Sequence, residues 1–202
     1  MSPLQNIEDL DQQPQLRHDN HAGVRMRLSK IGIAGALAPG LQAGQWIVAD
    51  AVLIDEVSIA TDRLWTGRLA ARLPEAKRGL VVGANAIVAE AAQKTALHRA
   101  TGASAVDMES HVVARVAQRH RLPFAVARVV SDAAHHSLPP AARVGMKSDG
   151  RMDLPSVLRS LLANPRQLPA LMRTGFVAEQ GFRALLRGYR RLGPGLAGPD
   201  LA

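Results

Sequence analysis

The sequence predicts an α/β protein in which helices cover both faces of a central sheet, giving a three-layer α/β/α arrangement. Two observations carry this prediction. Between residues 30 and 164, short runs of β-branched and apolar residues alternate with longer segments of helical spacing, as in parallel sheets flanked by helices. In addition, the run from Phe124 to Val130 is almost continuously apolar, which is typical of a strand buried on both faces.

The expected elements follow one another from Lys30 onward. Residues 31–41 predict a short strand that runs into a glycine-rich loop, and residues 45–54 predict a second strand. Residues 1–29 are polar, are interrupted by Pro14 and have no sustained period, so we expect them to be irregular. The remaining expected elements are helices at 64–73, 90–101, 108–120, 154–162 and 167–192, and strands at 79–82, 104–106 and 124–130.

Composition narrows the class of protein. A chain of 202 residues with 47% hydrophobic and 21% charged residues has enough apolar material for a globular domain. It contains no cysteine, which excludes disulfides and thiolate metal ligands. There is neither an apolar run of the roughly 18 residues that span a bilayer nor the basic-then-apolar start of a secretory signal. We therefore expect a cytoplasmic protein.

The positive charge gathers near the carboxyl terminus. The formal net charge is +8, and six arginines lie within residues 165–202. Because basic residues are not interleaved with aromatic ones, and no nucleic-acid-binding motif is present, we expect no nucleic-acid partner. On the helix at 167–192 the arginines oppose an apolar arc, a pattern typical of helices at the surface of an anionic membrane; ordinary packing on the domain is the alternative. The arc consists of Phe182, Leu185, Leu186, Tyr189 and Leu192.

Two acidic residues stand where strands are expected to end. Glu109 follows the strand at 104–106, and Asp132 follows the strand at 124–130. In open α/β sheets, ligands bind outside the carboxyl ends of the strands. We therefore expect Glu109 and Asp132 to face one crevice, and that crevice to be an enzyme active site.

Four segments, in this order, resemble the nucleoside phosphorylase family, which includes the 5′-methylthioadenosine/S-adenosylhomocysteine nucleosidases. Residues 32–44 resemble the family's glycine-rich ribose loop, and residues 82–88 its purine-pocket strand end. Residues 106–110 resemble its Met-Glu ribose motif, and residues 128–132 the strand that bears its base-protonating aspartate. The match covers roughly residues 30–140.

A closer resemblance is to the hopanoid-associated branch of this family, the adenosylhopane nucleosidases or phosphorylases. It rests on residues 97–111, on Ser137-Leu-Pro-Pro140 and on residues 164–171. It implies a substrate with adenine at one end and a hopane lipid on the 5′ carbon of the ribose. Family members are commonly dimeric or larger, so a homodimer is also implied.

The resemblance assigns roles that suit the chemistry of the residues. Cleavage of an N-glycosidic bond places negative charge on the departing base, which Asp132 would relieve as a general acid, and positive charge on the ribose, which Glu109 would oppose. The other implied substrate-binding residues are Met108 on the sugar, Ile87 and Val88 at the base, Gly32, Ala34 and Gly35 near the ribose or an anion, and Ser131 next to Asp132.

Simpler interpretations stand beside these roles. Asp132 can be a turn or cap residue, and Glu109 can merely complement a helix dipole. His135 and His136 lie in the segment 133–152, which is expected to be a loop that acts as a lid or faces the substrate. They lack further ligands at metal-binding spacing, so we expect no metal and no cofactor, with phosphate open as a co-substrate.

The sequence departs from the family at its start. Family members have a further strand and a glycine-containing loop before the ribose loop, whereas only 29 residues precede it here. We therefore expect an incomplete sheet with an unpaired edge. The nucleophile is not assigned, which leaves hydrolysis, phosphorolysis, a general purine nucleoside phosphorylase and an impaired, truncated member as alternatives. The expected units are residues 1–29, 30–164 and the basic helix and tail at 165–202.

Overall fold

The computed structural model of the chain describes residues 27–73, 75–144 and 153–198. The irregular segment expected before residue 27 and the last part of the loop expected at 133–152 lie outside these residues. No helix among the residues described is long and apolar enough to cross a membrane.

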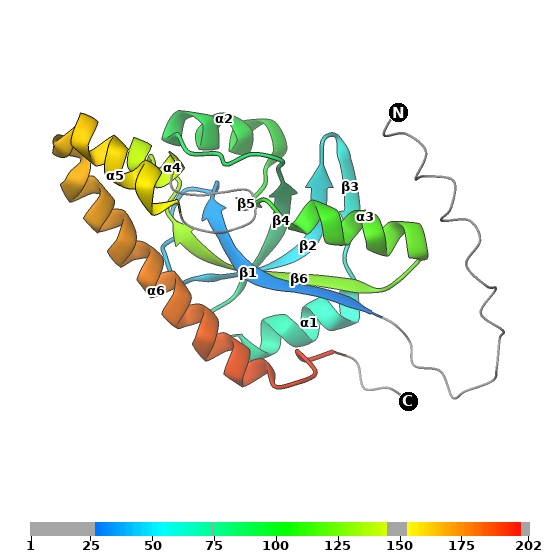
Figure 1. Cartoon of the computed structure of the whole chain (residues 1–202). Coiled ribbons are helices and arrows are strands. Elements are labelled where there is room, and N and C mark those ends of the chain that lie inside the picture. Colours follow the sequence, from blue (N-terminus) through cyan, green and yellow to red (C-terminus); the bar gives the residue numbers. More distant parts are fainter. Residues whose placement is uncertain (1–26, 74, 145–152, 199–202) are drawn as a thin grey trace, which may run out of the picture.

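Six strands form one mixed sheet at the centre of the molecule (Figure 1). Their order across the sheet is β3-β2-β4-β5-β1-β6. The β1 and β6 strands run parallel, as do β2 and β4, while β5 pairs antiparallel with the end of β1. The strands are β1 (Leu28–Ala36), β2 (Trp46–Ile54), β3 (Val57–Ala60), β4 (Lys77–Gly83), β5 (Ala105–Asp107) and β6 (Phe124–Asp132).

The sheet closes on itself, because β2 also pairs antiparallel with β6. Trp46 of β2 lies opposite Val129 of β6, and the Val130 amide donates to the Gln45 carbonyl at 2.9 Å. Among the described strands, β2 therefore occupies a position where an unpaired edge was expected. Closure satisfies the backbone donors and acceptors that an open edge would leave exposed.

Helices cover both faces of the sheet, which confirms the predicted fold class (Figure 1). On one face lie α1 (Arg63–Arg72) and α6 (Leu168–Leu192), and on the other α2 (Ala91–Thr101) and α3 (Ser110–His120). The short α4 (Pro140–Val144) and α5 (Leu154–Ala163) precede α6. As predicted, β6 is buried along residues 124–130.

Three local features differ from the expectations. The β1 strand begins at Leu28, inside the segment expected to be irregular, and continues through Ala36. The positions expected in a glycine-rich loop therefore lie within a strand. The β2 and β3 strands form an unexpected hairpin, whose turn is made by Asp55 in a left-handed conformation (φ 55°). The expected loop at 133–152 contains α4.

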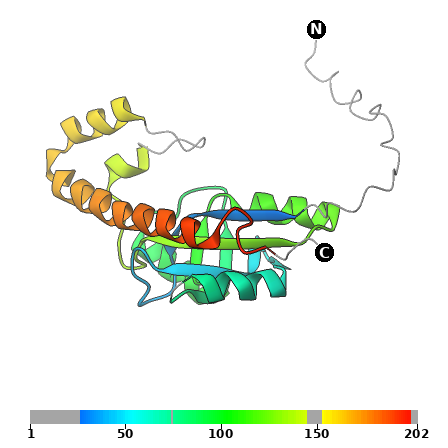
Figure 2. The ribbon, with the colours of Figure 1, turned by 90° about the horizontal axis from the view of Figure 1, so that it is seen from below.

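Small residues bring the carboxyl-terminal half of α6 against the sheet. Gly181, Ala184 and Gly188 are buried in this contact. A methyl group on Gly188 would lie 2.1 Å from Cζ2 of Trp46, so only glycine fits there. Figure 2 shows α6 lying along the sheet, with its first half and α5 extending beyond it.

The expected apolar arc of α6 is divided by this docking. Leu185 and Leu192 pack into the core with Trp46, whereas Phe182, Leu186 and Tyr189 are exposed. The helix thus packs on the domain and also keeps an apolar outer face.

Candidate active site

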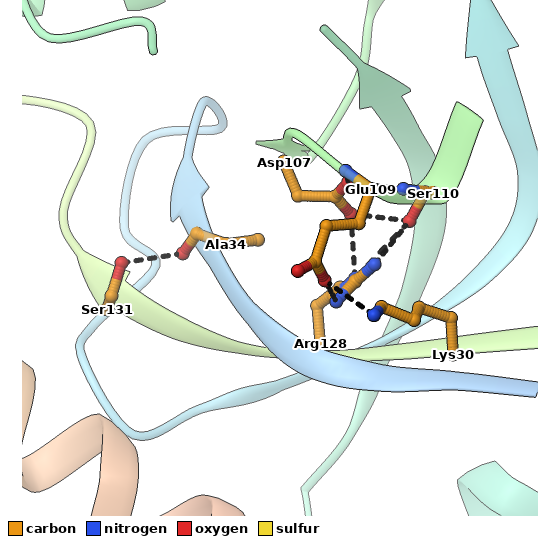
Figure 3. A network of polar contacts seen from close by, with 7 residues as sticks. All are labelled: Lys30, Ala34, Asp107, Glu109, Ser110, Arg128 and Ser131. Atoms are coloured by element: carbon orange, nitrogen blue, oxygen red, sulfur yellow. Dashed lines mark hydrogen bonds and ion pairs between the residues drawn. The ribbon is translucent and has the colours of Figure 1, made fainter. Parts of the chain in front are cut away.

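Two clusters of polar side chains lie beside β1. The first, which we call the Arg128 cluster, contains Lys30, Asp107, Glu109, Ser110 and Arg128 (Figure 3). Its centre is a buried ion pair in which Arg128 Nε lies 2.7 Å from Asp107 Oδ2. The other Asp107 oxygen accepts 2.7 Å hydrogen bonds from the amides of Glu109 and Ser110. Asp107 thus fixes the turn that places Glu109 at the start of α3.

Glu109 lies at the outer side of this cluster, with 57% of its side chain exposed. Its Oε2 atom lies 3.0 Å from Lys30 Nζ and 3.4 Å from Arg128 Nη1. Partial burial opposes ionisation of Glu109, but the two cations outweigh it and lower the pKa of the carboxyl below its ordinary value. Glu109 is therefore a carboxylate that can still meet a ligand.

Gly32 has no side chain, and the space this leaves is occupied by Arg128 of the same cluster. In the β1–β6 pairing Gly32 lies opposite Arg128, and a methyl group on Gly32 would lie 2.3 Å from Arg128 Nη1. Because Arg128 is fully buried and held by Asp107, it cannot move aside. Gly32 is thus required by the packing of Arg128.

The second cluster, which we call the Lys94 cluster, contains Lys94, Ser131 and Asp132. Lys94 of α2 is completely buried and forms an ion pair with Asp132 Oδ2. It also lies 2.8 Å from the His136 carbonyl and 3.3 Å from the Ala133 carbonyl. The Ser131 hydroxyl donates to Asp132 Oδ1 at 2.6 Å. The Asp132 side chain is 14% exposed, so part of it remains accessible to solvent.

A hollow of about 170 Å³ opens beside Asp132. One wall consists of residues 135–138, and the other comes from Ala170, Arg173, Thr174 and Val177 of α6. Arg173 lies 3.1 Å from His136 Nε2 and joins the two walls. Burial, the neighbouring His135 and the charges of Arg173 and Lys94 lower the pKa of His136. A neutral His136 can accept the hydrogen bond of Arg173.

The residues expected at the base lie beside the same loop. Ile87 and Val88 precede α2, and Val88 packs against the cluster around Val82 and Val106. The Leu138 amide donates to the Ala89 carbonyl at 2.8 Å, and the Ala91 amide donates to the Ser137 hydroxyl at 3.0 Å. These bonds join the segment that carries Ile87 and Val88 to the loop that follows Asp132.

The structure places Glu109 and Asp132 against different parts of β1. Because β5 pairs antiparallel with β1, the chain after β5 runs back toward Gly32 rather than out beyond Gly35. Glu109 Oε2 lies near Gly32, and Asp132 lies opposite Gly35. Gly35 is three residues from Gly32 along β1, which corresponds to roughly 10 Å of strand. The hollow beside Asp132 is not lined by Glu109.

The remaining expected residues fall between or beside the clusters. The Ser131 hydroxyl also lies 3.2 Å from the Ala34 carbonyl, which ties β6 to β1 (Figure 3). Met108 lies at the turn before α3 and is 37% exposed, so its side chain is available to a ligand.

Lys94 is the main residue that the sequence analysis missed. It falls on the same helical face as Ala91 and Leu97, which is an unusual position for a lysine unless a carboxylate is buried nearby. That signal predicts a buried partner, but it cannot identify Asp132, which lies 38 residues further along the chain.

The fold and these clusters define a protein of the nucleoside phosphorylase class: a mixed sheet between helix layers, with Met-Glu after β5 and Ser-Asp at the end of β6. A family model supports the assignment directly. The model described as "Phosphorylase superfamily" matches residues 26–162, and the chain belongs to this superfamily of enzymes. A search of curated proteins found no match.

Solved structures share the fold. A 5′-methylthioadenosine/S-adenosylhomocysteine nucleosidase from Colwellia psychrerythraea, in complex with adenine, is 15% identical with a TM-score of 0.52; the match covers 68% of this chain and 66% of that one. The nucleosidase from Campylobacter jejuni is 20% identical with a TM-score of 0.51, covering 76% and 68%. The S-adenosylhomocysteine nucleosidase from Streptococcus pyogenes, with 5-methylthiotubericidin, is 20% identical with a TM-score of 0.51, covering 79% and 66%. The matches span about two thirds of each relative.

Proposed function

We propose that this protein cleaves the N-glycosidic bond of a 5′-substituted adenosine and releases adenine. The observation that carries the proposal is the Lys94–Asp132 ion pair, whose Asp132 lines a hollow and is partly exposed. A buried ion pair costs desolvation energy and is weak evidence for stability alone. A role in proton transfer gives a reason for its position beside open space.

The proposed reaction breaks the bond between ribose C1′ and adenine N9, and both bonding electrons leave with the base. Asp132 gives a proton to N7 of the base while Lys94 passes one to Asp132, so that the pair becomes a neutral amine beside a carboxylate. A water molecule that attacks C1′ loses a proton, which restores the Lys94 ammonium. General acid catalysis of this kind contributes about 10²–10⁴-fold.

Glu109 has a separate role in this proposal. Its exposed carboxylate accepts hydrogen bonds from the ribose hydroxyls and stabilises the positive charge that develops at C1′. The roughly 10 Å between the parts of β1 beside Glu109 and Asp132 matches a substrate lying along β1, with the sugar toward Gly32 and the base toward Gly35. Ile87 and Val88 would then contact the base from the segment before α2.

The assignment of the substrate and that of the nucleophile are supported differently. The resemblance to hopanoid-associated members supports adenosylhopane as the substrate and hopanoid biosynthesis as the pathway. Water and phosphate both remain as nucleophiles, because no described residue near C1′ selects between them. Hydrolysis yields a free sugar, whereas phosphorolysis yields a sugar 1-phosphate and requires phosphate as co-substrate.

A specific observation favours a second candidate function. Glu109 does not line the hollow beside Asp132. A catalytically impaired member that binds the nucleoside without cleaving it would have this geometry.

Adenine release from an adenosine with an apolar 5′ substituent separates the two candidates. The wild type should release adenine, and Asp132→Asn should lower the rate about 10²–10⁴-fold. Asp55→Asn is a matched control, because Asp55 is exposed and lies in a left-handed turn that asparagine also favours. Product analysis with and without phosphate identifies the nucleophile. Binding without release by the wild type would establish the second candidate, and equal rates in Asp132→Asn and wild type would exclude Asp132 as the acid.

A further inference from the structure

The outer face of α6 carries an apolar stripe that nothing in the described structure covers. Six of its residues are between 47% and 63% exposed. Their spacing of three, four or six residues places them on one side of the helix, over a length of roughly 32 Å at 1.5 Å per residue. The stripe consists of Leu168, Met172, Phe176, Phe182, Leu186 and Tyr189.

Arginines line one flank of this stripe along its second half. Arg183, Arg187 and Arg190 are exposed and follow the stripe at helical spacing. The one acidic residue of α6 is Glu179, which accepts a 2.7 Å hydrogen bond from Arg183. The exposed face of α6 is therefore both apolar and positively charged.

The inner side of α6 is already occupied. Its second half packs on the sheet through Gly181 and Gly188, and its first half forms a wall of the hollow beside Asp132. The helix cannot rotate its stripe inward without breaking the glycine contacts with Trp46 and Val130. The stripe is consequently covered by something other than the described residues or remains in water, where an apolar surface of this length is unfavourable.

Charge decides between the partners that could cover it. A second copy of the chain, packed through the same face, would bring arginines against arginines with one glutamate per helix to offset them. An anionic lipid surface offers acyl chains to the stripe and phosphates to the arginines. We propose that α6 docks this protein on an anionic membrane, with the stripe in the interface and the hollow of Asp132 directly behind the helix.

Vesicle binding tests this docking surface without reference to adenine release, so its outcome is separate from that of the proposed function. The full chain is sedimented with vesicles of phosphatidylcholine or of an equimolar mixture of phosphatidylcholine and phosphatidylglycerol. We expect binding to the mixed vesicles, weakening with salt, and little binding to phosphatidylcholine. Arg183→Gln, Arg187→Gln and Arg190→Gln should each weaken binding on the order of fivefold. Arg72→Gln, Arg99→Gln and Arg119→Gln, at exposed positions on other helices, are the matched controls.

A tryptophan placed in the stripe reports membrane contact directly and keeps an apolar side chain at that position. Phe182→Trp should show a blue-shifted emission component with mixed vesicles, whereas Val112→Trp, on the exposed face of α3, should not. Equal binding to both vesicle types, or an unchanged Phe182→Trp spectrum, overturns the proposal. So does a concentration-dependent dimer that Leu186→Ser converts to a monomer, because that result would assign the stripe to a second copy of the chain.

Discussion

The two polar clusters beside β1 use the same kind of interaction for different ends. In the Arg128 cluster, Asp107 receives an arginine, a hydroxyl and two amides, and both partners of the central ion pair are buried. In the Lys94 cluster, the lysine is equally buried, but Asp132 is partly exposed and lines a hollow. In the Arg128 cluster, Asp107 has little capacity to bind a ligand. In the Lys94 cluster, Asp132 keeps some of that capacity.

This difference in exposure predicts different roles for the two clusters. Asp107 and Arg128 hold the turn before α3 and thereby place Glu109, but they are themselves closed to solvent. Asp132 is held by Lys94 on one side and faces open space on the other. We therefore expect substitutions in the Arg128 cluster to act mainly on folding, and substitutions in the Lys94 cluster to act on both folding and activity.

The largest expected effect is on the Arg128 cluster. Arg128→Met leaves the buried carboxylate of Asp107 without its cation, so the free energy of unfolding should fall by about 3–5 kcal/mol. Arg115→Met, which removes an exposed ion pair with Asp55 at 3.5 Å, should change it by less than about 1 kcal/mol. Urea unfolding of both variants provides the comparison. Similar losses in the two variants would contradict a structural role for the buried pair.

The next effect tests whether Lys94 and Asp132 act together. Lys94→Met and Asp132→Asn should each destabilise the fold, because each leaves one partner of the pair uncompensated. The double variant should lose less than the sum of the single losses, with a coupling energy of about 2–3 kcal/mol. Unfolding measurements on the four proteins of the cycle give this energy. Additive losses would show that the pair is not coupled.

The sequence predicted the class of fold because hydrophobic periodicity is local. The alternation of strand and helix patterns, the buried run before Asp132 and the Met-Glu segment are all readable from adjacent residues. Two decisive features are not local. The β2–β6 pairing joins segments about 80 residues apart, and the antiparallel pairing of β5 with β1 moves Glu109 toward Gly32. No local pattern specifies either pairing, so the sequence placed Glu109 and Asp132 after their strands but not at their positions along β1.

A smaller effect concerns the charge of Glu109. Lys30→Met removes one of the two cations that lower the pKa of Glu109, so that pKa should rise toward its ordinary value. A carboxyl whose folded pKa is depressed stabilises the fold above its unfolded pKa, and this contribution is lost as pH falls through the folded pKa. Carboxyl-carbon NMR titration of wild type and Lys30→Met measures the shift. An unchanged Glu109 titration would leave Arg128 as the sole effective cation.

The smallest effect links His136 to the α6 wall of the hollow. Its pKa is lowered by burial and by His135, Arg173 and Lys94, while Asp132 raises it. Since the unfolded histidine takes up its proton first, stability should decline as pH falls through the ordinary value of 6.5 and level off below the folded pKa. Protonation would also remove the acceptor that His136 offers to Arg173, so the contact between the loop and α6 should loosen in the same range.

His136→Gln, which keeps a hydrogen-bond acceptor without titrating, should flatten this part of the pH profile, whereas His120→Gln, at an exposed helix end, should not. Unfolding midpoints across this pH range measure the difference, and equal slopes in the two variants would exclude His136 as its source.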